Sequence, residues 1–225
     1  YNFTRKKNLR IIDISNFEQF KTTEQITKEF LRAKIKYLGS LTLNLKGEVL
    51  SEMEALKRIG CVGVANNGRP IVNTSVLRNA LAYASSLELL TVLDSSDAWL
   101  NDGGIIRSGA SSIVAGLSGI PNSSELIGLS RNLILIEETG VRAHMRNLSV
   151  SESAELIAQY KSPLITSDVG ITHLTLSDES IDPCNSNFKV IPPLPTNPDR
   201  DTLIAQLSEG KIDILSSKHQ PIAAD

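Results

Sequence analysis

The chain has 225 residues, of which 41% are hydrophobic and 21% charged, a composition typical of globular proteins that excludes disorder over the whole length. The formal net charge of −2 and the lack of a long basic run speak against nucleic acid or an anionic membrane as a partner. The apolar runs are too short to span a bilayer, and two distant cysteines without a secretory signal favour reduced thiols in a cytoplasmic protein.

The first half of the chain predicts short strands that alternate with helices. Residues 1–16 contain a strand-like apolar stretch, and Thr22 with Gln25 forms the capping box of a helix that extends to about Lys36. A long segment rich in glycine and serine, residues 95–122, has no phosphate-binding glycine pattern, and we interpret it as a flexible flap or an interaction surface. The elements predicted between these segments are strands at 37–43, 61–65 and 89–93 and helices at 51–60 and 76–85.

The second half continues the same alternation. Its strongest predicted helix covers residues 125–139 and ends at Gly140, the residue type that most often follows a helix. The other predicted elements are strands at 141–145, 164–167 and 212–215 and helices at 152–160 and 197–210. About six strands separated by helices predict a parallel sheet with helical cover, whereas a closed barrel needs eight such units in roughly 250 residues. We therefore expect unseen residues, a partner chain or a local rearrangement to cover the open edges.

Residues 188–222 resemble the corresponding segment of dihydroorotase, a metal-dependent amidohydrolase of pyrimidine synthesis. The family pattern reads N-P-P-L-R, a helix, then A-T-D-H-A-P-H, and its scaffold is kept by Pro192, Pro193, Leu194, His219 and Pro221. The resemblance extends from about Tyr37 to the end of the chain. It includes L-N-L-K-G-E at 43–48, N-N-G-R-P at 66–70 and S-G-I-P at 118–121.

This resemblance implies an α/β fold, a (β/α) TIM-type barrel of the metal-dependent amidohydrolase kind that is incomplete, with about six of eight units. It also implies that residues 1–20 supply strands of a small β domain, a remnant at the N-terminus, and that residues 21–225 form the barrel. The first two barrel strands of the family, with an H-x-H metal pair and an N-T-x-P substrate loop, have no counterpart before the helix that starts near Thr22. That segment is either lost from the gene or lies outside this sequence.

Comparison with the family motifs shows that the expected metal ligands are replaced. The motif D-D-G, with a metal-bridging carboxylate, corresponds to Asn66 and Asn67, and the ligand histidine of L-H-V-A-H-V-S corresponds to Asn147. Asp94 stands at the start of the family's H-C-E-D, and Lys218 replaces the metal-binding and catalytic aspartate. Neutral amides and an ammonium group are poor ligands for paired divalent ions. We therefore predict no metal and no catalytic residue at the vestigial positions Asn67, Asp94, Asn147 and Lys218, and we expect Lys218 to pair with Asp94.

The substrate contacts of the family are replaced as well. The resemblance places Ile191 at a substrate-binding asparagine, Pro195 at an arginine and Ile222 at a histidine. The histidines of the chain have neither the H-x-H nor the H-x-x-x-H spacing of a metal site. We expect structural or surface roles for His144, His173 and His219.

We therefore predict a non-catalytic dihydroorotase homologue without a cofactor. The resemblance implies the partner, because some bacterial aspartate carbamoyltransferases assemble with dihydroorotase-like chains that have lost their activity. The expected role is to hold the catalytic chains of that enzyme in a hetero-oligomer. Two alternatives stay open. One is a zinc-dependent cyclic amidohydrolase whose site is rebuilt from Asp94, Asp97 and His219 or completed by the missing segment. The other is a small-molecule sensor that uses the old pocket.

Overall fold

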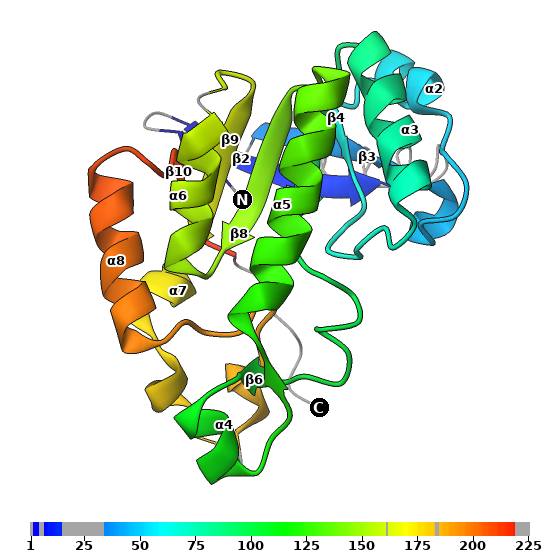
Figure 1. The fold of residues 1–225 in the computed structure, drawn as a ribbon. Coiled ribbons are helices and arrows are strands. Elements are labelled where there is room, and N and C mark those ends of the chain that lie inside the picture. Colours follow the sequence, from blue (N-terminus) through cyan, green and yellow to red (C-terminus); the bar gives the residue numbers. More distant parts are fainter. Residues whose placement is uncertain (1, 5–6, 15–33, 161, 183–184, 219–225) are drawn as a thin grey trace.

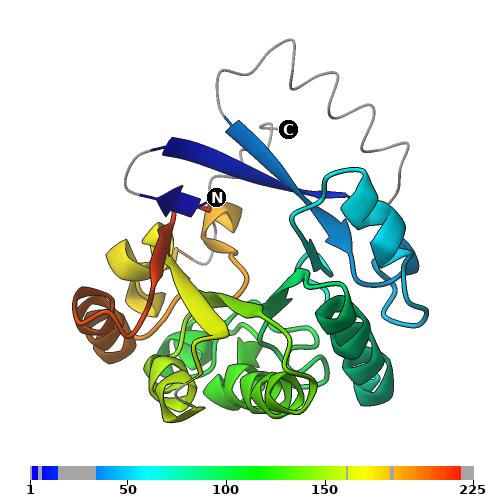
Figure 2. The same cartoon turned by 90° about the horizontal axis from the view of Figure 1, so that it is seen from above.

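Eight strands form a closed ring in the computed structural model, which describes residues 2–4, 7–14, 34–160, 162–182 and 185–218 (Figure 2). Around the ring the order is β1-β10-β9-β8-β5-β4-β3-β2. Neighbours pair in parallel except at β1, which is antiparallel to both β2 and β10. The strands are β1 (Asn2–Thr4), β2 (Lys7–Ile14), β3 (Lys34–Ser40), β4 (Gly63–Ala65), β5 (Leu90–Asp94), β8 (Ala143–Leu148), β9 (Ile165–Gly170) and β10 (Ile214–Ser216).

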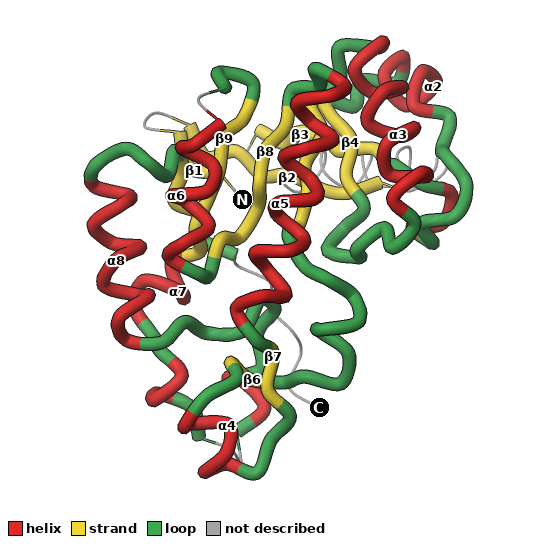
Figure 3. Tube along the Cα trace, in the orientation of Figure 1, coloured by secondary structure: helices red, strands yellow, loops and turns green. Residues whose placement is uncertain are grey.

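Helices lie on the outside of the ring (Figures 1 and 3). A smaller unit, in which α4 packs near the two-stranded sheet of β6 and β7, projects from one end of the barrel (Figure 1). The outer helices are α2 (Met53–Arg58), α3 (Thr74–Ser86), α5 (Asn122–Thr139), α6 (Ser151–Tyr160), α7 (Ile171–Thr175) and α8 (Asn197–Ser208). The small unit contains β6 (Ile106–Arg107), α4 (Ala110–Ala115) and β7 (Gly119–Ile120), and short 3-10 turns occur at Leu43–Leu45, Asp178–Ser180 and Ser186–Phe188. Every helix within the described ranges is too short or too polar to cross a membrane.

Local sequence signals fix the ends of the long helices. The Asn73 side chain accepts a hydrogen bond from the backbone of Ser75 at 2.9 Å and begins α3, and Thr196 caps α8 in the same way through the Asp199 amide at 3.3 Å. Helix α5 ends at Gly140, whose φ of 64° is left-handed and favours a residue without a side chain. These signals set the lengths of the helices that cover the sheet.

The main hydrophobic core lies between the strands and the helices α3, α5 and α6. Leu129, Leu133 and Ile136 form one buried face of α5 and belong to the same cluster as Leu81 of α3 and Met145 of β8. Full burial of such a side chain stabilises the fold by about 1.5–3 kcal/mol. This packing holds β5 and β8 in place and thereby positions the residues at their carboxyl ends.

The predicted barrel class is confirmed, with a change at the point of closure. We expected open edges, and the ring is instead closed by β1 and β2, the rearrangement that satisfies the exposed strand edges. Residues 2–4 and 7–14, which we assigned to a small β domain, pair within the barrel sheet, since β2 follows β3 over six positions from Leu9↔Lys34 to Ile14↔Gly39. The boundary at residue 20 stays a prediction. The helix expected at 22–36 lies outside the described residues except for 34–36, where the prediction is wrong because these residues belong to strand β3.

We interpreted the segment 95–122 as a flexible flap or an interaction surface, and the structure shows regular elements in place of a flexible flap. It contains β6, α4, β7 and the start of α5, and it buries Ile106, Arg107 and Ile120. Gly104 and Gly119 permit this packing, because a Cβ on Gly104 would lie 2.1 Å from Ile120 and one on Gly119 would lie 2.6 Å from Ser108. The glycines therefore allow close approach rather than mobility.

Candidate functional site

A cavity of about 800 Å³ lies inside the barrel, and its wall includes residues at the carboxyl ends of the strands. The interior of a TIM barrel is normally filled by side chains, whereas the described residues of this barrel leave a cavity. Its volume falls in the range of small-molecule sites. The polar residues of its wall include Asn67, Asp94, Arg107, Glu125, His144, Arg146, Asn147, Asp168 and Lys218.

Asp94 and Arg146 form a bidentate ion pair at the mouth of this cavity. They end or nearly end the adjacent strands β5 and β8 and are partners in the register of that pair. Arg146 donates from Nε to Oδ1 of Asp94 at 3.1 Å and from Nη2 to Oδ2 at 2.8 Å, and the Gly68 amide donates to the same carboxylate at 3.1 Å. This fork geometry is the strongest form of an Arg–carboxylate contact. The carboxylate at this vestigial metal position is therefore already bound by donors of the protein.

Lys218 reaches the same mouth from the segment after β10. Its Nζ donates to the carbonyl oxygen of Ile191 at 3.2 Å. Its stem passes over Gly170, where a Cβ would lie 2.4 Å from Cδ of Lys218. Burial lowers the pKa of the Lys218 ammonium to about 8, opposed by the charges of Asp168 and Asp94. We predicted a direct ion pair between Lys218 and Asp94, and this prediction is wrong. Arg146 binds the Asp94 carboxylate, and Lys218 donates instead to the carbonyl oxygen of Ile191.

Three vestigial positions share an uncommon backbone conformation. Asn67 after β4, Asn147 within β8 and Lys218 after β10 have φ values of 49°, 62° and 46°. Left-handed φ is tolerated by asparagine, but for lysine it costs on the order of 1–2 kcal/mol. The backbone N–H of Asn147 donates to Oδ1 of Asp168 at 2.8 Å, and this bond holds the backbone at Asn147 in place. The backbone at these three strand ends is therefore left-handed, although none of the three side chains is a metal ligand.

His144 and Asp168 connect β8 to β9 below the mouth. The ring of His144 contacts Thr166 Oγ1 through Nδ1 at 2.8 Å and Asp168 Oδ2 through Nε2 at 3.0 Å. His144 is 5% exposed and Asp168 2% exposed, so both nitrogens of the ring have buried partners. This geometry agrees with the structural role expected for His144. Sequence reasoning missed Asp168, although its alternation with Thr166 along β9 places both on one face.

His173 is buried beneath the segment 191–193. Its Nε2 lies 3.0 Å from the carbonyl oxygen of Pro192, so Nε2 carries the proton, and its Nδ1 lies 3.2 Å from Thr172 Oγ1. Burial first, and then the positive charge of Lys218, lower the pKa of His173 to about 3. His173 is therefore neutral near pH 7 and has a structural role, as predicted. His219 lies outside the described residues.

A second buried charge pair, Arg107 and Glu125, lies in the wall and was also missed. The guanidinium of Arg107 donates from Nη2 to Ser149 Oγ at 2.6 Å and to the carbonyl oxygen of Pro193 at 3.1 Å. Glu125 accepts from the Ser149 amide at 3.1 Å, from the Ser149 hydroxyl and from Ser153 Oγ at 2.6 Å. Burial lowers the pKa of Arg107, and Glu125 is the leading charge that raises it. The hydroxyl of Ser149 thus links the two charges.

The remaining predicted positions contribute no polar groups to the cavity. Ile191 is exposed at its mouth, and Pro195 is buried and accepts from the Asp178 amide at 2.8 Å. Ile222 lies outside the described residues. Asp97, which the enzyme alternative requires, accepts from the amides of Trp99 and Leu100 at 3.0 Å each and so stabilises a local turn. 

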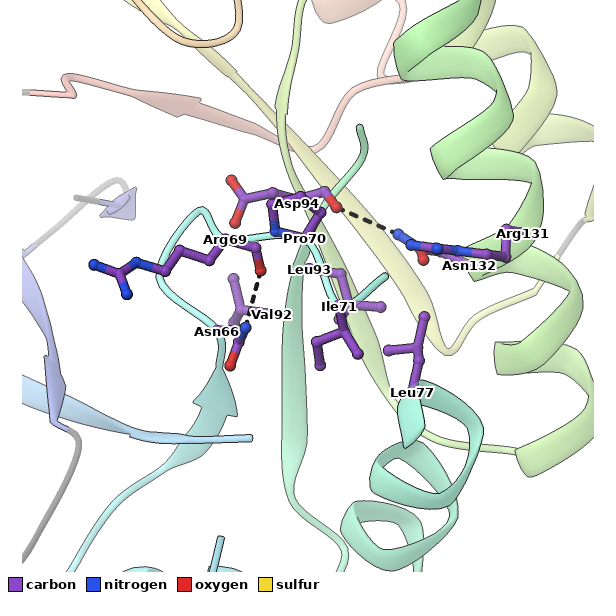
Figure 4. A pocket seen from close by; sticks show the side chains of 10 residues that line it. All are labelled: Asn66, Arg69, Pro70, Ile71, Leu77, Val92, Leu93, Asp94, Arg131 and Asn132. Atoms are coloured by element: carbon purple, nitrogen blue, oxygen red, sulfur yellow. Dashed lines mark hydrogen bonds between the residues drawn. The ribbon is translucent and has the colours of Figure 1, made fainter. Parts of the chain in front are cut away.

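A small second cavity of about 20 Å³, large enough for about one water, is lined in part by Asp94. Figure 4 shows the side chains that line it. The Asn132 amide donates to the main-chain oxygen of Asp94 at 3.4 Å, while the Asp94 carboxylate points away from it (Figure 4). Asn66 turns aside from the barrel mouth, because it accepts from Thr42 Oγ1 at 2.8 Å and donates to the carbonyl of Arg69 at 3.0 Å. The side-chain amide of Asn66 therefore forms its hydrogen bonds with neighbouring loop residues and does not face the mouth of the large cavity.

These donors do not fit a pair of divalent cations. No group of three or more His, Cys, Asp or Glu side chains suited to a metal ion occurs in the described ranges. The Asp94 carboxylate is bound by Arg146, and Asn67 and Asn147 offer only neutral amides. Lys218 adds a positive charge at the mouth, which repels a divalent ion. The described part of the site is therefore unsuited to the metal chemistry that the resemblance implies.

The fold defines an amidohydrolase-type (β/α) barrel. L-hydantoinase (dihydropyrimidinase) from Arthrobacter aurescens aligns with a TM-score of 0.79 at 19% identity, over 94% of this chain and 50% of that one. Dihydroorotase from Campylobacter jejuni aligns with a TM-score of 0.69 at 15% identity, over 98% of this chain and 64% of that one. At such identities the likeness shows the fold alone.

Sequence comparison identifies the family. The model of a family described as "Dihydro-orotase-like" matches residues 15–153. A "Dihydroorotase-like protein" from Pseudomonas putida is 41% identical over 201 residues, 88% of this chain and 47% of the relative, and a "Dihydroorotase" from Thermoanaerobacter sp. is 37% identical over 194 residues, 85% and 45% of the two chains. The chain belongs to the dihydroorotase-like family. It spans about half the length of the curated relatives that it matches.

Proposed function

We propose that this chain belongs to a non-catalytic dihydroorotase homologue of the cytoplasm that acts as a structural partner of aspartate carbamoyltransferase in pyrimidine biosynthesis. The observation that carries the proposal is the bidentate Arg146–Asp94 pair with Lys218 beside it. In an active relative this mouth would have to attract divalent metal ions. Here Arg146 already binds the Asp94 carboxylate, and the ammonium of Lys218 adds a positive charge that would repel a divalent ion.

The preserved shape of the barrel supports a structural role. The strand ends keep left-handed turns at Asn67, Asn147 and Lys218, and buried polar contacts brace β8 against β9. A chain that folds as the family's barrel but lacks its metal ligands is expected where binding to a partner is selected and hydrolysis is not. The identity of the partner comes from the family resemblance alone. The implied assembly is a hetero-oligomer with the catalytic chains of the transcarbamoylase.

The test uses the full-length protein from its own source. We expect it to purify with aspartate carbamoyltransferase at a fixed stoichiometry, and we expect that enzyme to lose its large assembly when this protein is deleted. Metal analysis of the purified complex should find no stoichiometric zinc on this protein. Independent migration of the two proteins in sizing and pull-down experiments would contradict the proposed partnership.

The second candidate is a zinc-dependent cyclic amidohydrolase, an active dihydroorotase. It is favoured by relatives named dihydroorotase at 35–37% identity and by the portion of the relatives that this chain does not span. Cyclisation of N-carbamoyl-aspartate by metal-loaded, full-length protein separates the two candidates. Turnover that disappears in Asp94→Asn and is kept in a Glu138→Gln control on the outer surface of α5 would establish the enzyme and reject the structural proposal.

A further inference from the structure

The fold directs the side chain of Lys218 to the large cavity. Lys218 belongs to the cavity wall, and its stem passes over Gly170, where a Cβ would lie 2.4 Å from Cδ of the lysine. Its backbone is left-handed, with a φ of 46°, a conformation that a lysine keeps where the surrounding structure imposes it. A lysine at a free surface would instead extend its amino group into bulk water. The amino group is therefore held against the cavity.

This amino group has no carboxylate in contact with it. Asp168 and Asp94, the carboxylates that influence Lys218 most, have partners of their own in the barrel. Within the described ranges Lys218 forms no ion pair, and its Nζ donates to the carbonyl oxygen of Ile191 at 3.2 Å. His173 beside it is neutral near pH 7, because its pKa is about 3. A carbonyl oxygen accepts from a neutral amine as well as from an ammonium group, so the contact with Ile191 does not require the charged form.

The surroundings of Lys218 favour the neutral amine. Burial is the main cause that lowers the pKa of Lys218 to about 8, and the charge of Arg146 on β8 lowers it further. The carboxylates of Asp168 on β9, Asp94 on β5 and Glu125 on α5 oppose this shift without cancelling it. At pH 7 about one such amine in ten is neutral, against fewer than about one in a thousand for an ordinary lysine. A fraction of the protein therefore presents a nucleophilic nitrogen at neutral pH.

The cavity offers space and apolar contacts to a molecule that reacts with this nitrogen. Its volume is about 800 Å³, and its wall includes the apolar side chains of Leu38, Val92, Ile191 and Ile214. Lys218 is partly exposed, and its hydrogen bond to Ile191 lies at an exposed position, so a small molecule can reach Nζ. Lysines that are partly desolvated or lie near another cation are those that form Schiff bases with carbonyl compounds. The apolar wall suits a carbonyl compound with a short hydrocarbon chain.

We propose that Lys218 forms a reversible imine with short-chain aliphatic aldehydes that enter the cavity. The lone pair of Nζ attacks the carbonyl carbon, the carbonyl oxygen takes up a proton, and the nitrogen releases a proton to water, which gives a carbinolamine. Loss of the hydroxyl group as water then forms the C=N bond. One amine and one aldehyde thus give one imine and one water, and no electrons are exchanged with a third reactant. This inference goes beyond the structural role proposed above and does not depend on it.

The test is reductive trapping of the purified protein with butyraldehyde and sodium cyanoborohydride at pH 7, followed by peptide mass spectrometry. Cyanoborohydride delivers a hydride to the imine carbon and leaves a stable N-butyl group on the lysine. Lys57 is the matched internal control, because it is exposed and its Nζ also donates to a carbonyl oxygen, that of Leu87 at 2.6 Å. We expect Lys218 to be alkylated at least about tenfold faster than Lys57, because more of its amine is neutral. In concentrated urea the two lysines should react at similar rates.

A variant of the neighbouring arginine tests the role of the surroundings. Arg146→Met removes a positive charge near Lys218 and frees the carboxylate of Asp94, so it should slow the alkylation of Lys218 several-fold and leave that of Lys57 unchanged. Arg78→Met, on the outer surface, is the matched control and should change neither rate. Equal rates at Lys218 and Lys57 in the folded wild type, a preference for Lys218 that persists in urea, or unchanged alkylation in folded Arg146→Met would overturn the proposal. If Arg146→Met fails to fold, the comparison of folded and unfolded wild type still decides.

Discussion

The buried pair of Arg107 and Glu125 provides the sharpest test of how the barrel wall is stabilised. Glu125→Gln removes the negative charge but keeps the shape of the side chain and one acceptor oxygen. In the structure the carboxylate, 4% exposed, accepts from the Ser149 amide, the Ser149 hydroxyl and the Ser153 hydroxyl, and its charge compensates Arg107. Loss of one partner of a buried pair costs about 3–5 kcal/mol, and each hydrogen bond to a charged group contributes about 1.5–3 kcal/mol. Because glutamine retains one acceptor, we expect a loss of about 3 kcal/mol.

Urea denaturation followed by circular dichroism measures this loss as a lower midpoint at an unchanged slope. Glu138→Gln on the same helix is the matched control, since Glu138 is exposed and pairs with Arg78 on the surface, and its effect should be much smaller. The double variant with Arg107→Met should lose less than the sum of the two single changes, because the charges are coupled. A change below about 1 kcal/mol in Glu125→Gln would refute the claim that this carboxylate is needed to hold the buried guanidinium.

Three further predictions follow from the strand ends. The pKa of His173 in the folded protein is about 3, below its ordinary 6.5, so between these pH values only the unfolded state binds the extra proton. The free energy of unfolding should therefore fall as the pH drops through this window. In His173→Gln the free energy of unfolding should depend less steeply on pH. Gly170→Ala should destabilise the fold by about 1–3 kcal/mol in urea, because its Cβ would meet the Lys218 stem, and Lys218→Ala in the same chain should recover part of the loss. Asn147→Gly should be tolerated, whereas Asn147→Val should cost about 1–2 kcal/mol at its φ of 62°, and equal midpoints for the two variants would contradict this strain.

The alternation of apolar strands and capped helices was sufficient to predict a parallel sheet with helical cover, because each element carries its own signal, whereas the barrel class was implied by the family resemblance. Gly140 ends α5 at the predicted residue, and β5, β8 and β9 fall within a few residues of their predicted ranges. Such local signals could not predict that β1 and β2 close the barrel. The antiparallel contact of β1 with β10 joins Asn2 to Ser216, and no local pattern specifies a pairing of residues so far apart in sequence.

The sequence predicted which residues line the cavity better than it predicted the contacts that they make. Asn67, Asp94, Asn147 and Lys218 all line the cavity, as their places after strands suggested. Arg146 was missed because adjacent residues of a regular strand face opposite sides, so Asn147 and Arg146 should not both line one cavity. The register shift between Met145 and Leu148 removes this alternation and turns both toward the mouth. A bulge depends on the neighbouring strand and leaves no clear mark in a single sequence.

Paired metals in a barrel mouth tie together ligands from several strands, and this chain achieves cross-strand links by other means. Arg146 joins β8 to Asp94 of β5 and, through that carboxylate, to the loop at Gly68. Asp168 of β9 holds the Asn147 turn of β8, and Lys218 ties the segment after β10 to Ile191. Opposite charges and backbone groups thus satisfy each other where an anionic ligand set would need cations to offset its repulsion. A mouth stabilised in this way gains no stability from zinc, so added chelator should leave the unfolding midpoint of the protein unchanged.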